Sequence, residues 1–242
     1  MPEIAMVAAL EREIWPLVKH WRVAEQEYGG RKFRFFEKDP RIAVCGGIGP
    51  EAARRATEAV IALYQPRAVQ SVGFAGALES GLQVGEVLEV RYVIDVADGS
   101  KIDTGRGAAV LVSFASVAGS EQKSRLAKSY DATAVDMEAA AVAKGAEAHG
   151  LPFAAIKVIS DEIGFPMPPV DQFTTQNGGF RTASFVSFVA VRPWLWTRVI
   201  RLARNSAKAS RALCERLARD TGTRLNGAVG QESAAVGGDG AQ

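Results

Sequence analysis

Residues 134–143 read AVDMEAAAVA, in which two carboxylates, Asp136 and Glu138, stand on either side of a methionine. The residues that follow are all small and apolar, which is not the composition of a helix face exposed to water. Acids that enter such a stretch either cap a helix or face a ligand. We predict a helix over residues 134–150 that is stopped by Gly150, with one of the two acids near its start.

Strand and helix patterns alternate on both sides of this stretch. The sequence predicts buried strands at residues 3–10, 31–38, 41–49, 68–78, 85–97, 107–119 and 152–164, and helices at 11–21 and 50–64. The apolar runs are continuous instead of alternating, which is typical of strands covered on both faces. Together these patterns predict an α/β fold with a mostly parallel or mixed sheet and helices on both faces.

The composition is that of an ordinary globular protein without a strong charge bias. The chain has 242 residues, which favours one large α/β domain, and 29 Lys and Arg against 27 Asp and Glu. This balance does not indicate a nucleic-acid partner. The two cysteines are far apart, and two histidines are too few to support a metal site or a Ser–His–Asp triad. We expect a cytoplasmic protein without a signal peptide, a membrane-spanning helix, a metal or a cofactor.

Further acids follow strands, where ligands bind in α/β folds. Asp161 ends the strand KVISD, and Glu13 follows the first strand. Each acid has an ordinary explanation, because Asp161 could cap the next segment and Glu13 could favour a helix dipole. The functional alternative for Asp161 is a general acid that a dry pocket keeps neutral.

The glycine-rich stretch GGIGPEAA at residues 46–53 fits a loose GxGxxA pattern between a strand and a helix. Such a pattern can bind a dinucleotide, but it then needs an acid at the end of the following strand. The next strand instead runs into VGFAGAL, which contains no acid. We therefore favour a tight turn, or a glycine loop that comes close to another kind of ligand.

Five motifs occur together in a fixed order along the chain. They are AALEREI (8–14), GGIGPEAA (46–53), VGFAGAL (72–78), VDMEAAA (135–141) and PFAAIKVISD (152–161). In this combination the chain resembles the nucleoside phosphorylase and nucleosidase superfamily, and within it the methylthioadenosine/S-adenosylhomocysteine nucleosidases. The resemblance covers about residues 3–165. It implies a three-layer phosphorylase-like fold, with a mixed central β-sheet flanked by helices, and a homodimer.

The resemblance also implies a role for each matching residue. Glu13 matches the acid that activates the attacking water, and Glu138 matches the carboxylate that binds the 2′- and 3′-hydroxyls. Asp161 matches the acid that protonates the purine at N7, and general acid assistance of this kind is worth roughly 10²–10⁴-fold. The other matching positions are Phe74, Ala75 and Gly76 under the ribose and base, Met137 against the sugar, Ser160 beside Asp161, and Val117 in place of a phenylalanine over the base.

Other features bear on the reaction and the substrate. The loop VGFAGAL has no arginine for a phosphate, which favours water as the nucleophile, and Arg12 is the basic candidate beside the first loop. An Asp at the base site suits a 6-aminopurine. Residues 98–107, DGSKIDTGRG, are shorter than the flap of related nucleosidases, which indicates a bulky 5′-group. We therefore expect a nucleosidase that releases adenine from a 5′-modified adenosine, a small-molecule partner.

The C-terminal part of the chain is basic and aromatic. Residues 192–213, RPWLWTRVIRLARNSAKASRAL, are similar to a segment of hopanoid-associated members of the superfamily, which implies the lipid-linked nucleoside adenosylhopane as substrate. We expect a catalytic domain (1–179), a basic amphipathic extension (180–220) and a disordered tail (221–242). The extension either contacts the inner membrane surface or packs on the domain or on a dimer mate.

Three other functions stay open on the sequence alone. The first is a methylthioadenosine/S-adenosylhomocysteine nucleosidase, and the second is a purine nucleoside phosphorylase. The third is a purine-binding or lipid-surface module without catalysis, because the short flap could reflect lost chemistry.

Overall fold

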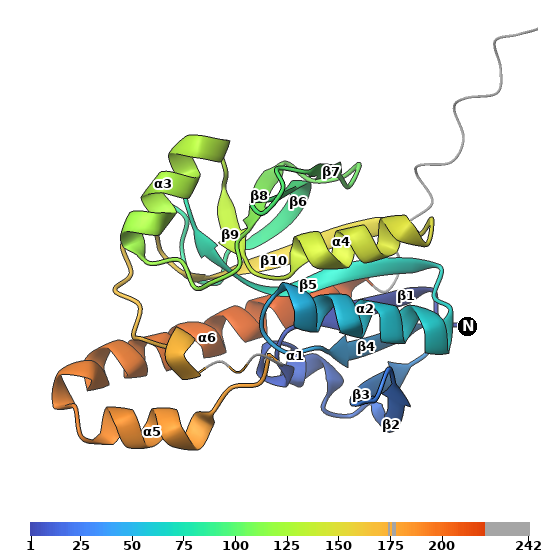
Figure 1. Ribbon diagram of the computed structural model, residues 1–242, viewed down its shortest axis with the longest axis horizontal. Coiled ribbons are helices and arrows are strands. Elements are labelled where there is room, and N and C mark those ends of the chain that lie inside the picture. The colour runs from blue at the N-terminus through green and yellow to red at the C-terminus, as the bar shows by residue number, and fades with distance from the viewer. Residues whose placement is uncertain (174, 176–177, 221–242) are drawn as a thin grey trace, which may run out of the picture.

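The computed structural model describes residues 1–173, 175 and 178–220, and the predicted disordered tail at 221–242 lies outside them. The described chain forms a mixed sheet of ten strands with helices on both faces (Figure 1). In chain order the elements are β1 (Ile4–Ala8), α1 (Glu11–Val18), β2 (Arg22–Tyr28), β3 (Arg31–Lys38), β4 (Arg41–Cys45), α2 (Pro50–Tyr64), β5 (Ala68–Ala77), β6 (Val87–Asp95), β7 (Lys101–Asp103), β8 (Ala109–Ser113), α3 (Ser120–Tyr130), β9 (Ala134–Asp136), α4 (Ala139–Ala148), β10 (Phe153–Asp161), the 3₁₀ turn η1 (Asp171–Phe173), α5 (Thr182–Ala190) and α6 (Pro193–Arg219).

Strand β5 is the centre of the sheet. It pairs in parallel with β1 and β10 and antiparallel with β9. The pairings β9–β8, β8–β6 and β6–β10 then close these strands and β5 into a ring. Buried side chains from all five strands of the ring, including Ala75, Leu111 and Ile159, form one core cluster. Strands β4, β3 and β2 continue the sheet beyond β1 as an open flank.

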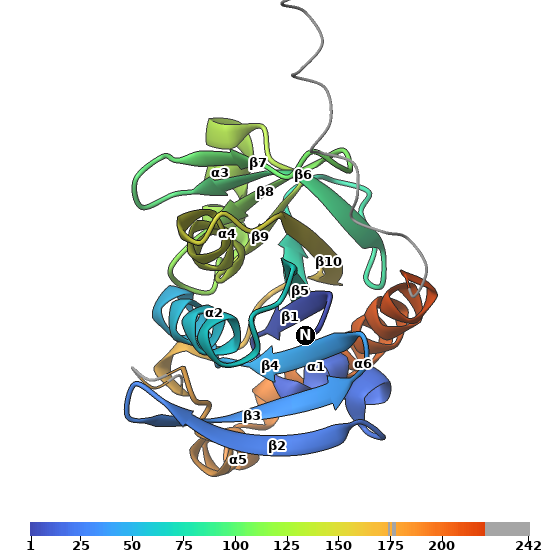
Figure 2. The ribbon, with the colours of Figure 1, turned by 90° about the vertical axis from the view of Figure 1, so that its right-hand side faces the viewer.

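Helices cover both faces of the open part of the sheet, as Figure 2 shows. Alternate residues of β1 point to opposite faces, so that Ala5 and Val7 pack with α2 and α4, whereas Met6 and Ala8 pack with α1 and α6. Helix α2 begins at Pro50, which suits a first helical turn, and buries Ala53 and other small residues at helical spacing. The predicted three-layer α/β fold with a mixed central sheet is confirmed.

The stretch AVDMEAAAVA differs from its prediction. It is not one helix over 134–150, because residues Ala134–Asp136 form strand β9 and helix α4 begins only at Ala139. The short strand pairs with both β5 and β8, which are distant in the sequence. The carboxylate of Asp136 then accepts a hydrogen bond of 2.9 Å from the Ala139 amide at the start of α4. The sequence also did not predict β2, β7 or α3.

The predicted extension at 180–220 forms two helices, α5 and α6. The second half of α6 contributes Ala209, Leu213 and Leu217 to the core cluster that also contains residues of α1 and the sheet. This half is therefore part of the domain core. In the part of the chain that the structure describes, each helix is too short or too polar to cross a lipid bilayer.

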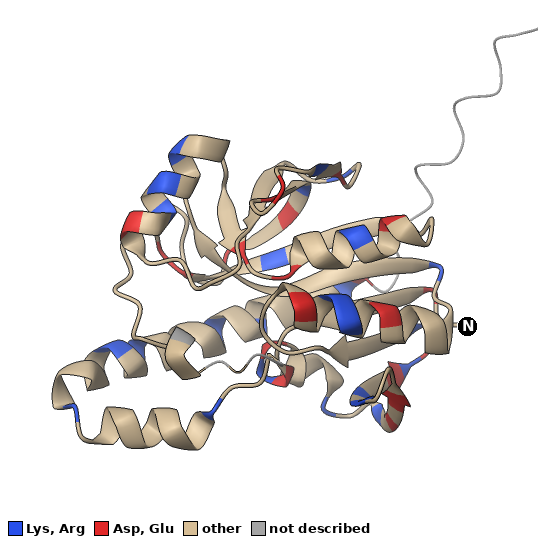
Figure 3. Ribbon diagram, in the orientation of Figure 1, with Lys and Arg blue, Asp and Glu red and all other residues tan. Residues whose placement is uncertain are grey.

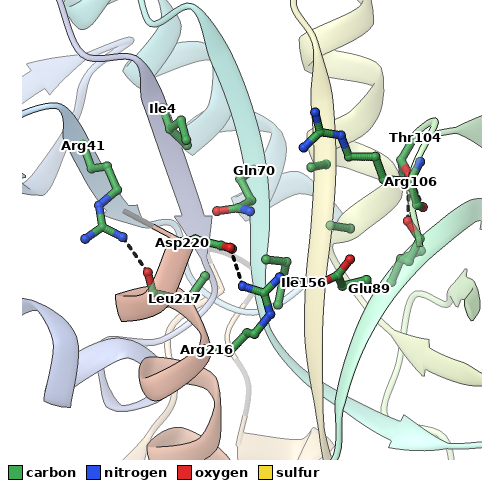
Figure 4. A pocket seen from close by; sticks show the side chains of 13 residues that line it. Ile4, Arg41, Gln70, Glu89, Thr104, Arg106, Ile156, Arg216, Leu217 and Asp220 are labelled. Carbon is green, nitrogen blue, oxygen red and sulfur yellow. Dashed lines mark hydrogen bonds and ion pairs between the residues drawn. The ribbon is translucent and has the colours of Figure 1, made fainter. Parts of the chain in front are cut away.

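The C-terminal end of α6 lies over the amino ends of β1, β4 and β10, next to a cavity of about 270 Å³ (Figure 4). The Arg41 guanidinium donates a hydrogen bond of 2.7 Å to the carbonyl of Leu217. Arg216 forms ion pairs with Glu89 of β6 and with Asp220. These contacts hold the end of α6 against the sheet edge opposite to the carboxyl ends of the parallel strands.

Truncation of Leu213 tests whether α6 belongs to the core. We expect Leu213→Ala to lower the free energy of unfolding by about 2–5 kcal/mol, because it leaves a cavity at a fully buried position. The matched control is Arg211→Ala on the exposed face of the same helix, with an expected change within about 0.5 kcal/mol. Chemical denaturation measures both. Equal stability of the two variants would contradict the packing of α6.

Candidate active site

A cavity of about 400 Å³ opens at the carboxyl ends of β1, β5 and β10. The structure brings to this one cavity all nine residues that the sequence singled out for the site: Glu13, Phe74, Ala75, Gly76, Val117, Met137, Glu138, Ser160 and Asp161. They come from five separate segments of the chain. Their individual roles stay predictions, but the position at the carboxyl ends of parallel strands is that of ligand sites in α/β folds.

Glu13 reaches the cavity from the first turn of α1, directly after β1. Its side chain crosses β5 at Gly73, where a Cβ atom would lie only 2.7 Å from Glu13 Oε2. Gly73 also has a φ of 148°, which glycine adopts without strain. Glu13 is 5% exposed, and its buried Oε2 accepts no hydrogen bond from the described residues. A buried oxygen of this kind is free to accept a hydrogen bond from a bound group.

The electrostatic environment of Glu13 makes it a base suited to neutral pH. Burial raises its pKa to about 7, against the lowering effect of the positive charges of Lys157 and Arg12. A carboxylate with a pKa near the working pH is partly ionised and still basic enough to take a proton from water. Glu13 thus combines an oxygen that lacks a hydrogen-bond partner among the described residues with a pKa near neutrality.

The two acids of the opening motif have different surroundings. Asp136 is buried, caps α4, and accepts a hydrogen bond of 2.6 Å from the hydroxyl of Ser113. Glu138 instead lines the cavity, and its Oε1 accepts a hydrogen bond of 2.8 Å from the amide of Gly49. The glycine loop that follows β4 thus positions Glu138, a contact that the sequence did not predict. Burial, followed by the charge of Asp136, raises the pKa of Glu138 to about 8.

Lys157 is a buried cation beneath these acids. It lies on β10, is 1% exposed, and its amino group lies 2.8 Å from Asp136 Oδ2. Burial alone would lower the pKa of Lys157, but the charges of Asp136, Glu138 and Glu13 outweigh that effect and raise it. The sequence reasoning missed this residue, although a lysine inside the buried strand AAIKVIS was a usable signal.

Asp161 also has a cation beside it. Ser160 donates a hydrogen bond of 2.7 Å to Asp161 Oδ1. The amino group of Lys123, from α3, forms an ion pair with Asp161 Oδ2, and both side chains are buried. The sequence predicted an acid kept neutral by a dry pocket and did not indicate this lysine. Because the sequence did not predict α3, it also did not predict that Lys123 lies near the site.

The outer wall of the cavity is apolar. Helices α5 and α6 and the segment before them add the side chains of Met167, Val170, Phe180, Phe185, Val186 and Leu202. Phe180 and Phe185 belong to an aromatic cluster with Phe173 and Phe188, in which the Phe173 and Phe185 ring centroids are 5.3 Å apart. The nine residues that the sequence predicted are thus only part of the lining of a larger cavity.

The described residues do not group three or more His, Cys, Asp or Glu side chains in a way that could hold a metal ion. The ionisable groups that line the cavity are instead four acids, Glu13, Asp136, Glu138 and Asp161, with Arg12 and Lys123. Such a set is suited to proton transfer at a bound organic molecule.

A family model described as the phosphorylase superfamily matches residues 3–114 and 108–189. The chain belongs to this superfamily. The match confirms the superfamily inferred from the five motifs. The 5′-methylthioadenosine/S-adenosylhomocysteine nucleosidase of Staphylococcus aureus strain JH9 is 26% identical over 198 residues, which cover 65% of this chain and 86% of that protein.

Solved structures of nucleosidases share the fold. The Helicobacter pylori 5′-methylthioadenosine/S-adenosylhomocysteine nucleosidase with butyl-thio-DADMe-Immucillin-A has a TM-score of 0.62 at 19% identity, covering 90% of this chain and 99% of that one. The futalosine hydrolase of Helicobacter pylori strain 26695 has a TM-score of 0.62 at 20% identity, covering 90% and 98%. At these identities the likeness establishes the fold.

Titration of Glu138 gives a test of the site without any substrate. Its raised pKa means that the folded chain holds a proton which the unfolded chain loses near pH 4.5, so the contribution of Glu138 to stability is greatest below that pH and declines up to about pH 8. We expect Glu138→Gln to make this decline shallower by up to about 1.4 kcal/mol per pH unit. Denaturation between pH 5 and 8 measures it. The control is Glu79→Gln at an exposed position, and an unchanged slope in Glu138→Gln would contradict the buried-acid account.

Proposed function

We propose that this chain is a purine nucleosidase that hydrolyses the N-glycosidic bond of a 5′-modified adenosine and releases adenine. The observation that carries the proposal is the single cavity in which the unpartnered oxygen of Glu13, the carboxylate of Glu138 and the Ser160–Asp161 pair converge. The similar proteins, which are 5′-methylthioadenosine/S-adenosylhomocysteine nucleosidases and a futalosine hydrolase, support the same reaction class.

The three acids divide the chemistry of such a hydrolysis. Glu13, ionised near neutral pH, takes a proton from the attacking water. Glu138 forms hydrogen bonds with the ribose hydroxyls, and its ionised form offsets the positive charge that develops on the sugar as the bond breaks. Asp161 delivers a proton to the departing purine. Met137, Phe74, Ala75, Gly76 and Val117 form the surfaces against which the sugar and base pack.

Water is favoured over phosphate as the nucleophile by the charges in the cavity. Its cationic lining residues are Arg12 and Lys123, and Lys123 is already paired with Asp161. The carboxylate of Glu13 would repel a phosphate at the same place. A purine nucleoside phosphorylase is therefore the less favoured alternative, with Arg12 as its phosphate ligand.

The 5′-group that we propose is large and apolar, as in adenosylhopane, with methylthioadenosine or S-adenosylhomocysteine as the alternative. The support is the apolar outer wall from α5 and α6, which leads from the acids toward a hairpin with exposed Trp194, Trp196 and Ile200. Figure 3 shows that α5 carries no charged residue, while basic residues lie along α6. Exposed aromatic and basic side chains of this kind suit a membrane surface. A homodimer and a cytoplasmic location remain predictions from the sequence.

Substitution of the proposed base tests the reaction. We expect Glu13→Gln to lower kcat for adenine release from 5′-methylthioadenosine or a lipid-linked adenosine by roughly 10²–10⁴-fold, because an amide cannot take a proton from water. The matched control is Glu11→Gln, two residues earlier in α1, where the side chain pairs with Arg34 outside the cavity. Activity near that of the unmodified protein in Glu13→Gln would rule out this base. A lack of adenine release from all substrates would favour the non-catalytic binding module.

Replacement of the exposed aromatic residues tests the membrane contact. We expect the triple variant Trp194→Ser, Trp196→Ser, Ile200→Ser to bind vesicles that contain phosphatidylglycerol at least about tenfold more weakly than the unmodified chain, because apolar area and basic charge act together in binding. Trp15→Ser removes a comparably exposed tryptophan from α1 and serves as the control. Co-sedimentation measures both, and equal binding by the triple variant would contradict the contact.

A further inference from the structure

The buried pair of Lys123 and Asp161 is the part of the cavity that the proposed chemistry leaves unexplained. The Lys123 amino group donates to Asp161 Oδ2, to the Glu162 carbonyl at 2.9 Å and to the Asp161 carbonyl at 3.4 Å. Its three N–H groups are therefore all used. Asp161 in turn accepts one hydrogen bond on each carboxylate oxygen, since Ser160 donates to Oδ1. In this arrangement a lysine N–H group points directly at one carboxylate oxygen of Asp161.

The fold makes specific room for this pair. At Gly76, a Cβ atom would lie 3.0 Å from both Asp161 Oδ2 and Lys123 Nζ, and 2.9 Å from Lys123 Cε. Any side chain at position 76 would therefore press on the two charged groups. Lys123 is 2% exposed, and a lysine at that depth is rare unless it is paired. Three elements, α3, β5 and β10, thus cooperate to place an ammonium group behind the acid.

This placement matters because a purine departs as a neutral molecule only if it gains a proton. Both carboxylate oxygens of Asp161 accept a hydrogen bond, and the donor to Oδ2 is an ammonium group that can pass a proton to it. We propose, resting on the proposed nucleosidase function, that Lys123 is a positioning residue that supplies the proton which Asp161 passes to the departing purine. An ordinary ion pair that only orients Asp161 would not require the proton to move.

The C–N bond breaks and its electron pair goes to the purine. Asp161 Oδ2 takes a proton from the Lys123 ammonium, and that carboxyl group gives a proton to a purine ring nitrogen. The attacking water forms the new C–O bond and loses its proton to Glu13. After the products leave, Glu13 releases its proton to solvent and Lys123 takes one up.

The other ionisable groups around the pair are few. Arg12, Glu13, Asp136 and Glu138 line the same cavity. On the far side, Glu162 lies 3.5 Å from Arg201 of α6. The other buried lysine, Lys157, is paired with Asp136. The ammonium group in contact with Asp161 is that of Lys123.

The test compares two leaving groups in the full chain. Adenine needs a proton to leave, whereas 4-nitrophenolate, released from a 4-nitrophenyl riboside, does not. We expect Lys123→Met to lower kcat for adenine release by at least about 100-fold with KM within a few-fold, and to leave 4-nitrophenolate release within a few-fold of the unmodified chain. Lys128→Met, on the exposed face of α3, is the matched control. Equal losses with both leaving groups would overturn the inference.

Two further measurements separate proton supply from orientation. The first uses the unmodified chain, so it can be made even if Lys123→Met does not fold. We expect kcat of the unmodified chain to fall at alkaline pH with the adenosine substrate and not with the nitrophenyl riboside. Identical dependence of kcat on pH for the two substrates would overturn the inference. Lys123→Arg keeps the charge but holds its proton too tightly to transfer it, so we expect it to remain at least about 100-fold slow with adenine as leaving group. Full activity of Lys123→Arg would show that orientation alone suffices.

The proposed function and this inference fail in different ways. If the unmodified chain releases neither adenine nor 4-nitrophenolate, the nucleosidase function fails, and the inference fails with it. If the unmodified chain releases adenine and Lys123→Met does so at a similar rate, only the role of Lys123 is rejected.

Discussion

The buried ion pair between Asp136 and Lys157 is the contact on which the site depends. Asp136 lies at the junction of β9 and α4, where it also accepts hydrogen bonds from Ser113 of β8 and from the Ala139 amide. One carboxylate thereby joins two strands, a helix start and a cation. Breaking such a pair by removing one partner costs about 3–5 kcal/mol, because the other charge stays buried. With Asp136 fixed in this way, the next acid, Glu138, is turned toward the cavity.

The same cation keeps several acids close together. Glu13 and Glu138 both have pKa values raised by burial, and Lys157 lowers both toward their ordinary values. Glycines provide the room, because Gly73 lets Glu13 cross the central strand and Gly49 donates its amide to Glu138. The sheet therefore holds two carboxyl groups of raised pKa at one end of its parallel strands. A second buried lysine, Lys123, pairs with Asp161 in the lining of the same cavity.

The sequence predicted the layers of the fold and the inner half of the site, because both rest on local patterns. Continuous apolar runs predicted β1, β5 and β10. Glu13 and Asp161 were predicted as site residues because each follows or ends one of these strands. The three-residue strand β9 could not be predicted, since only its pairing with β5 and β8 stabilises it. The lysines were missed for a similar reason. Lys123 is 38 residues from the acid that it pairs with, so its sequence neighbours do not show that it is buried.

The central claim is hydrolysis by water at a purine nucleoside, and the products formed in the presence of excess phosphate test it most directly. The unmodified protein is incubated with a 5′-modified adenosine, with and without phosphate, and the sugar product is identified by mass spectrometry. The account predicts adenine and a free sugar in both cases, at the same rate. A sugar 1-phosphate, or adenine release that requires phosphate, would contradict it.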